Sequence, residues 1–127
     1  MDFGIARMAK DSMTRQSMTN TIAGTPPYMA PEQEQGTVRI ESDVYALGVC
    51  LYEMTTGHLP FSGSGAAMLL NKLNGKLIPP SQRTPTLSPG LDSVIAKALA
   101  PDPDKRYRTA AELIAALDAL IAVDLAS

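Results

Sequence analysis

The run SDVYALGVCLYEMTTG, residues 42–57, constrains the fold of this chain more than any other part of the sequence. Ser42 or Asp43 can serve as its N-cap and Gly57 as the residue that ends it, so the run predicts one helix. The large apolar side chains of this helix point in all directions; they are Val44, Tyr45, Leu47, Val49, Leu51, Tyr52 and Met54. A helix that is apolar all round is a buried central helix. Gly48 in its middle costs about 1 kcal/mol relative to Ala, so we expect close packing there.

Three further segments predict helices around the central one. Residues 64–75 form a short helix between Ser64 and Gly75, and residues 78–90, with four prolines, form an irregular crossing. Ser88 and Pro89 begin a helix as N-cap and first helical residue. Its apolar stripe follows the 3.6-residue period and consists of Leu91, Val94, Ile95, Ala98 and Leu99. A capping box of Thr109 and Glu112 begins the last helix, which buries Leu113, Leu117, Leu120 and Ile121.

Residues 1–41 differ from the rest because they show neither helical nor strand periodicity. Pro26, Pro27 and Pro31 each remove a backbone donor and restrict the preceding residue. This stretch predicts a long N-terminal loop of the kind that is uncommon unless functional, the alternative being a floppy terminus. The fold class is therefore mainly α.

Composition and charge exclude several classes of function. A net charge of −2 gives no basic footprint for nucleic acid, and no run approaches the roughly 20 apolar residues of a membrane span. The N-terminus has no secretory signal pattern, so we expect a cytoplasmic protein. The lone Cys50 is interpreted as a buried small hydrophobe. Lys72, Lys76 and Arg83 are interpreted as solvated surface, and His58 as a loop residue.

Five motifs occur in order along the chain: MDFGIAR, GTPPYMAPE, SDVYALGVCLYEM, GHLPF and DPDKRYRTAAEL. Together they resemble the second half of a Hanks-type protein serine/threonine kinase domain, most closely its bacterial branch. The resemblance covers essentially the whole chain. It implies the helical part of the C-terminal lobe at residues 42–127, preceded by an activation segment at residues 1–32.

The resemblance assigns Asp2 to the Mg²⁺ that bridges ATP phosphates, a task that needs a carboxylate on a turned backbone. Phe3 would be the apolar plug beneath that site, and Gly4 would permit the dihedral angles of the turn. Taken alone, this tripeptide is an ordinary Asp-x-Gly turn.

The same resemblance makes residues 5–29 the activation and substrate-docking segment. Ser17, Thr19 and Thr21 lie where the family carries phosphoacceptors, and a phosphate there can order the loop against arginines. Thr25 would touch the catalytic base from the substrate side. For each hydroxyl, exposed loop filler is the alternative.

Two structural roles also follow from the resemblance. Glu32 of the APE motif and Arg106 of DKRYR form a pair in the family, and a guanidinium can hold a carboxylate with two parallel hydrogen bonds. Asp43 would accept backbone hydrogen bonds from the catalytic loop; the alternative is an N-cap.

Phosphoryl transfer also needs a glycine-rich loop, a β3 lysine with its glutamate partner and a His-Arg-Asp loop, none of which is present in these 127 residues. We therefore expect a truncated kinase domain that is inactive alone, with Mg²⁺, ATP and a protein substrate belonging to the intact parent. The start at Met1, where kinases usually have an apolar residue, agrees with truncation. The alternative is a non-catalytic binding module whose loop another kinase phosphorylates.

Self-association is the last expectation. In a complete kinase, the central helix, residues 43–56, is covered by helices and a catalytic loop that precede Asp2. Those covers are absent from these 127 residues, so we expect the apolar side chains of this helix to stay exposed and to find another surface. This predicts a homodimer or larger oligomer through the central helix.

Overall fold

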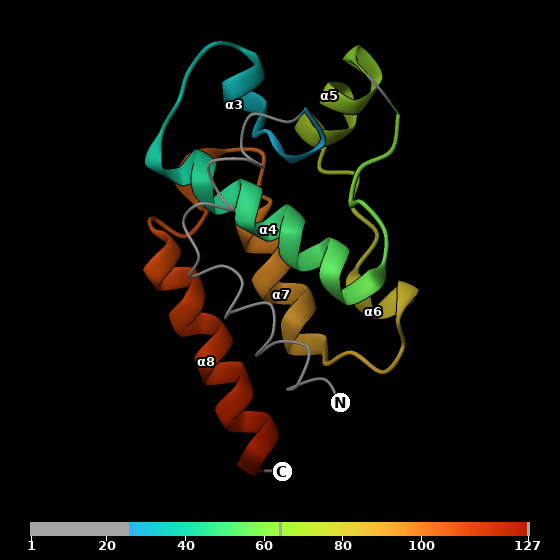
Figure 1. Cartoon of the computed structure of the whole chain (residues 1–127), viewed down its shortest axis with the longest axis vertical. Helices are drawn as coiled ribbons and strands as arrows, with labels where there is room; N and C mark the ends of the chain where they lie inside the picture. Colours follow the sequence, from blue (N-terminus) through green and yellow to red (C-terminus); the bar gives the residue numbers. More distant parts are fainter. Residues whose placement is uncertain (1–25, 64, 127) are drawn as a thin grey trace.

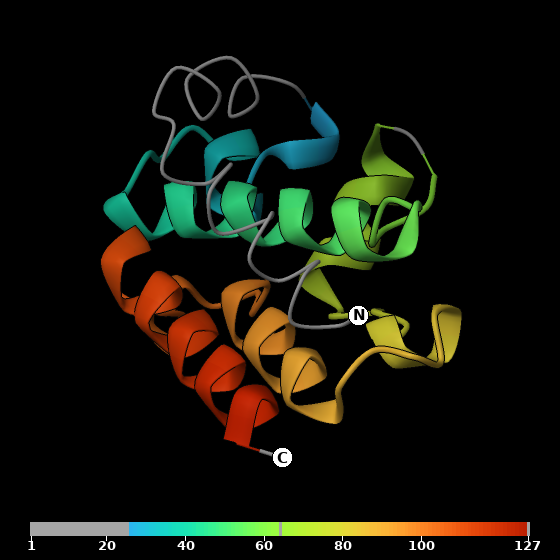
Figure 2. The ribbon, with the colours of Figure 1, turned by 60° about the horizontal axis from the view of Figure 1, so that its bottom comes forward.

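The computed structural model describes residues 26–63 and 65–126, and helices dominate this part of the chain (Figure 1). The long helix α4 (Ile40–Thr56) crosses the middle. α3 (Pro31–Glu34) and α5 (Ala66–Leu73) lie on one side of it, whereas α7 (Pro89–Ala98) and α8 (Ala110–Ala126) lie side by side on the other (Figures 1 and 2). Short helical turns complete the path: η1 (Pro26–Tyr28), α6 (Pro80–Arg83) and η2 (Pro103–Lys105). The mainly α fold class is confirmed.

The central helix is buried within a single chain. Of the seven large apolar side chains named from the sequence, six are at most 5% exposed and Met54 is 39% exposed; Ile40, the first residue of α4, is 68% exposed. The expectation that these side chains stay uncovered is therefore wrong for all but Met54. The apolar faces of the neighbouring helices cover them, so an open central helix gives no reason for self-association.

α4 begins earlier than the sequence predicted. Its first residue is Ile40 and its N-cap is Arg39, so neither Ser42 nor Asp43 is the N-cap. Ser42 instead caps from inside the helix, because its Oγ accepts a hydrogen bond from the Arg39 N–H at 3.1 Å. Asp43 is exposed in the first turn, where a negative charge is favourable. The predicted helix end is confirmed: Gly57 adopts φ 76°, in the left-handed region.

Gly48 marks the close approach of α4 and α7. A Cβ at this position would lie 2.9 Å from Ala98 Cβ and 3.0 Å from Leu99 Cδ2, closer than side chains normally come. The buried stripe of α7, predicted from its period, supplies these contacts. The close packing expected at Gly48 is confirmed.

The ends of α7 and α8 agree with the predicted caps in part. Ser88 Oγ accepts the Gly90 N–H, as expected of an N-cap before Pro89. Thr109 Oγ1 accepts the Glu112 N–H at 3.2 Å. The return bond differs from a capping box, because Glu112 Oε1 accepts from the N–H of Arg108 rather than of Thr109.

The proline-rich crossing contains the short helix α6, which the sequence did not predict. Its Arg83 Nε donates to the Tyr52 hydroxyl at 2.8 Å, and that hydroxyl donates to the Ile78 carbonyl at 2.7 Å. Ser81 donates through both its N–H and its Oγ to the Asp92 carboxylate. These side chains tie the crossing to α4 and α7.

Candidate functional site

The described residues contain three of the site residues chosen from the sequence: Glu32, Asp43 and Arg106. The others, Asp2, Phe3, Gly4, Ser17, Thr19, Thr21 and Thr25, lie outside the described residues. Glu32 and Arg106 come together although 74 positions separate them. Asp43 lies in the first turn of α4, and its side chain is exposed.

Arg106 holds Glu32 in a bidentate ion pair. Its two terminal nitrogens donate to the two carboxylate oxygens, Nη1 to Oε2 at 2.7 Å and Nη2 to Oε1 at 2.8 Å. The Arg106 side chain is 0% exposed and the Glu32 side chain 11%. A planar guanidinium matches a carboxylate in this way, and a lysine cannot.

Carbonyl groups complete the surroundings of the Arg106 guanidinium. Nε donates to the Ala100 carbonyl at 2.7 Å, Nη1 also donates to Glu41 O, and Nη2 also donates to Pro101 O. The guanidinium lies 4.7 Å from the ring centroid of Tyr45, within range of a cation–π contact. With all five N–H donors supplied with acceptors, Arg106 joins α3, α4 and the loop after α7.

Glu32 has a second partner in α4. Ser42 Oγ donates to Glu32 Oε2 at 2.6 Å. Burial by itself would raise the pKa of Glu32, but the hydrogen bonds from Arg106 and Ser42, with help from the Arg106 charge, lower it below its ordinary value. Glu32 is therefore held as a carboxylate at the start of α3.

Tyr28, just before α3, is fixed by another carboxylate. Its hydroxyl donates to Glu53 Oε1 of α4 at 2.5 Å. This hydrogen bond, followed by burial, raises the pKa of Tyr28 to about 12. The sequence analysis did not identify this pair, because 25 positions separate its members.

Lys72 is the third charged side chain that holds this stretch, and its interpretation as solvated surface is wrong. Its side chain is 0% exposed, and Nζ donates to the Met29 carbonyl at 2.8 Å and to Glu34 Oε2 at 2.9 Å. The available signal was its position four residues after Met68, which puts both on the inward face of α5. We call residues 28–34 the anchored segment.

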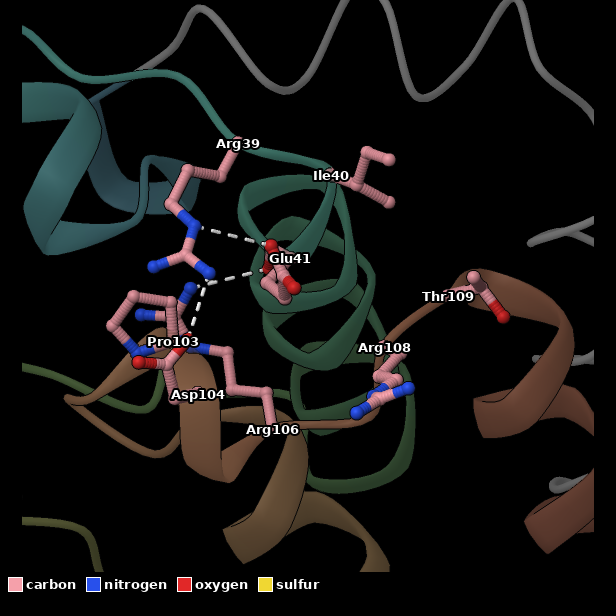
Figure 3. Close-up of a pocket in the computed structure, with 8 residues that line it drawn as sticks. All are labelled: Arg39, Ile40, Glu41, Pro103, Asp104, Arg106, Arg108 and Thr109. Carbon is pink, nitrogen blue, oxygen red and sulfur yellow. Dashed lines mark hydrogen bonds and ion pairs between the residues drawn. The ribbon is translucent and has the colours of Figure 1, made fainter.

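A hollow of about 530 Å³ opens beside Arg106 (Figure 3). It is lined by Arg39, Ile40, Glu41, Pro103, Asp104, Arg106, Arg108 and Thr109. Arg39 donates to Asp104 Oδ1 at 2.7 Å and lies 3.3 Å from Glu41 Oε1. Because Arg106 is neutralised by Glu32, the two remaining arginines are matched by two carboxylates. The hollow therefore offers no net charge to attract an anion.

Residues 26–63 and 65–126 contain no group of three or more His, Cys, Asp or Glu side chains that could hold a metal ion. In the same stretches, no helix combines the length and apolar character needed to cross a bilayer.

Comparison with known proteins decides the family. Residues 1–116 match the family model of the protein kinase domain. The chain belongs to this family. It is 47% identical over 119 residues to the serine/threonine-protein kinase PknB of Mycolicibacterium smegmatis, covering 92% of this chain and 19% of that protein. It is 42% identical over 126 residues to the probable serine/threonine-protein kinase CE0033 of Corynebacterium efficiens, covering 94% and 19%.

The predicted resemblance to bacterial Hanks-type kinases is thus confirmed, and this kinase-family chain spans 19% of the length of these relatives. Solved structures agree on the fold. Rad53 residues 1–466 in complex with AMP-PNP superpose with a TM-score of 0.61 at 30% identity, covering 72% of this chain and 25% of that one. Titin kinase gives a TM-score of 0.65 over 76% of this chain and 18% of that one; at 24% identity it supports the fold alone.

Proposed function

We propose that this chain is the substrate-docking and C-terminal-lobe part of a protein serine/threonine kinase, whose intact form transfers phosphate from Mg-ATP to serine or threonine of proteins. The observation that carries the proposal is the anchored segment. Three charged side chains from separate elements hold it, Glu53, Lys72 and Arg106. Docking a peptide in a reactive position requires such a preorganised backbone.

Residues outside the anchored segment complete the proposal. Ser17, Thr19 and Thr21 would receive activating phosphates, and Thr25 would face the catalytic base. Asp2 would hold Mg²⁺, which supplies charge neutralisation for the phosphates when it is bound. Asp43 would receive backbone hydrogen bonds from the catalytic loop. Each of these roles comes from the family resemblance.

We further propose that the 127-residue polypeptide is inactive by itself. It contains no glycine-rich loop, no β3 lysine and no His-Arg-Asp loop. Of the residues that contact the nucleotide in the family, these 127 residues then include Asp2 alone. A single carboxylate binds Mg²⁺ weakly, because that ion normally relies on several ligands.

Two experiments test the proposal. Calorimetry with Mg-ATP and a phosphotransfer assay on the 127-residue chain should show neither binding nor transfer; micromolar affinity that Asp2→Ala abolishes would contradict inactivity. The second uses a graft, which is M. smegmatis PknB with its matched residues replaced by this chain. The graft should phosphorylate a protein substrate, and a folded but inactive graft would contradict the docking role.

A binding module is the second candidate function, and α5 provides the observation in its favour. Leu70 and Leu73 are 58% and 41% exposed, and both lie on the outward face of this helix. An apolar strip of this kind is suited to a protein partner, including a second copy. Light scattering after size exclusion tests self-association: a dimer that Leu70→Gln disrupts supports this module, and a monomer at tens of micromolar opposes it.

A further inference from the structure

The inward face of α5 carries a charge where an apolar side chain is expected. Met68 and Lys72 are its buried residues, and Lys72 has no exposed surface. Lysine is almost never fully buried unless it is paired, because removing an ammonium group from water is costly. A leucine would fill this position without that cost, so the charge itself needs an explanation.

The Lys72 ammonium group is directed at main chain. It reaches back 43 positions to the Met29 carbonyl at 2.8 Å, and Glu34 Oε2 accepts from it at 2.9 Å. Met29 and Ala30 lie between η1 and α3, in neither helix. Side chains bind two of their backbone groups: Lys72 binds the Met29 carbonyl, and Gln33 Oε1 accepts the Ala30 N–H at 3.0 Å. The Ala30 carbonyl accepts from the N–H groups of Gln33 and Glu34 in α3.

Lys72 differs from the other anchors in what it holds. Arg106 and Glu53 hold side chains of the anchored segment, those of Glu32 and Tyr28. Lys72 holds a peptide carbonyl and so fixes the path of the backbone itself. It also makes α5 the support of this point, because α3 and α5 are in contact.

We propose that Lys72 is a positioning residue that sets the backbone at Met29 and Ala30 for docking of the substrate peptide beside its phosphoacceptor. Glu34 is its counterion and keeps the ammonium group directed at the Met29 carbonyl. The inference rests on the proposed function, since it concerns how a protein substrate is bound. It assigns substrate affinity to Lys72 and leaves nucleotide binding and the chemical step to other groups.

The first test uses the 127-residue chain and amide hydrogen exchange. A hydrogen bond to a charged group changes an opening equilibrium by about tenfold or more. Lys72→Met should therefore speed exchange about tenfold at the amides of Ala30 and Gln33. The amide of Leu99, bonded to Ile95 O at the end of α7, should be unaffected. Lys76→Met, at an exposed lysine just after α5, is the matched control.

Two outcomes of this test overturn the inference. Unchanged exchange at Ala30 and Gln33 would mean that Lys72 does not hold this backbone. A uniform rise that includes α7 would mean that Lys72 supports the fold as a whole.

The second test uses the graft. Lys72→Met should raise the KM for a peptide substrate about tenfold while kcat and the KM for ATP stay unchanged, because one charged hydrogen bond acts on peptide docking alone. Lys72→Arg should restore part of the loss. An equal fall of kcat with all substrates overturns the inference. An inactive parent graft contradicts the proposed function instead, and hydrogen exchange then decides the role of Lys72.

Discussion

Replacing Arg106 with alanine should destabilise the chain more than removal of any exposed charge. The change removes two hydrogen bonds to Glu32 and three to the carbonyls of Ala100, Pro101 and Glu41. It also leaves the Glu32 carboxylate, only 11% exposed, without its cationic partner. Removing one member of a buried pair costs about 3–5 kcal/mol, a large part of the 5–15 kcal/mol that keeps a domain folded.

Thermal unfolding followed by circular dichroism measures this cost. For a chain of this size, a loss of 3–5 kcal/mol corresponds to a fall in Tm of about 10–20 °C. Arg106→Lys should lose most of the same stability, because an ammonium group cannot make the two parallel bonds. Arg108→Ala is the matched control, since this neighbouring arginine is exposed and a surface substitution changes stability by about 0.5 kcal/mol at most.

The double variant separates pairing from packing. Glu32→Met combined with Arg106→Met should be less destabilised than the sum of the single changes, because neither charge is left buried alone. Equal Tm values for Arg106→Ala and Arg108→Ala would refute the reasoning, since the pair would then contribute no more than a solvated one.

Three further predictions concern single positions in or beside the core. Gly48→Ala should cost about 1–3 kcal/mol in urea unfolding, despite the higher helix propensity of alanine, because the new methyl would lie 2.9 Å from Ala98 Cβ; an unchanged midpoint would mean that α7 can move away. Tyr45→Phe should leave the Tm unchanged or raise it, because the Tyr45 hydroxyl is buried without a hydrogen-bond partner in the structure as described, and a clear fall would reveal a partner. The pKa of Glu32 is lowered on folding, so its contribution is complete above its ordinary value of 4.5 and is lost as the pH falls through the folded value. Glu32→Gln should therefore show a flatter loss of stability between pH 5 and pH 2 than the parent chain, in urea titrations at a series of pH values; parallel curves would contradict this.

Sequence reasoning succeeded where the signal is local. The end of α4 at Gly57 and the start of α7 at Ser88 and Pro89 depend on residues within one turn of the helix terminus. The buried stripe of α7 depends on a period that can be counted along the chain. Burial of Cys50 followed from its apolar neighbours, and in the structure burial raises the pKa of its thiol to about 11.

The predictions from sequence were wrong where a side chain binds a partner that is distant along the chain. Lys72 follows Asn71 and lies two residues before Asn74, and its partner Glu34 lies 38 positions away. The start of α4 was placed too late for a similar reason. The Ser42 hydroxyl both accepts from Arg39 and donates to Glu32, so its role depends on α3 as well as on its own helix.

Prolines in and just before the anchored segment explain why distant charges help to hold it. Pro26, Pro27 and Pro31 have no N–H, so the chain from residue 26 to residue 31 has few backbone donors, although the Ala30 carbonyl accepts from the N–H groups of Gln33 and Glu34. Side chains on α4, on α5 and in the loop after α7 add the long-range contacts. A change in the packing of any of these elements therefore reaches the anchored segment through a charged hydrogen bond of 2.5–2.8 Å. In the proposed kinase role, this arrangement makes peptide docking depend on the stability of the whole helical lobe.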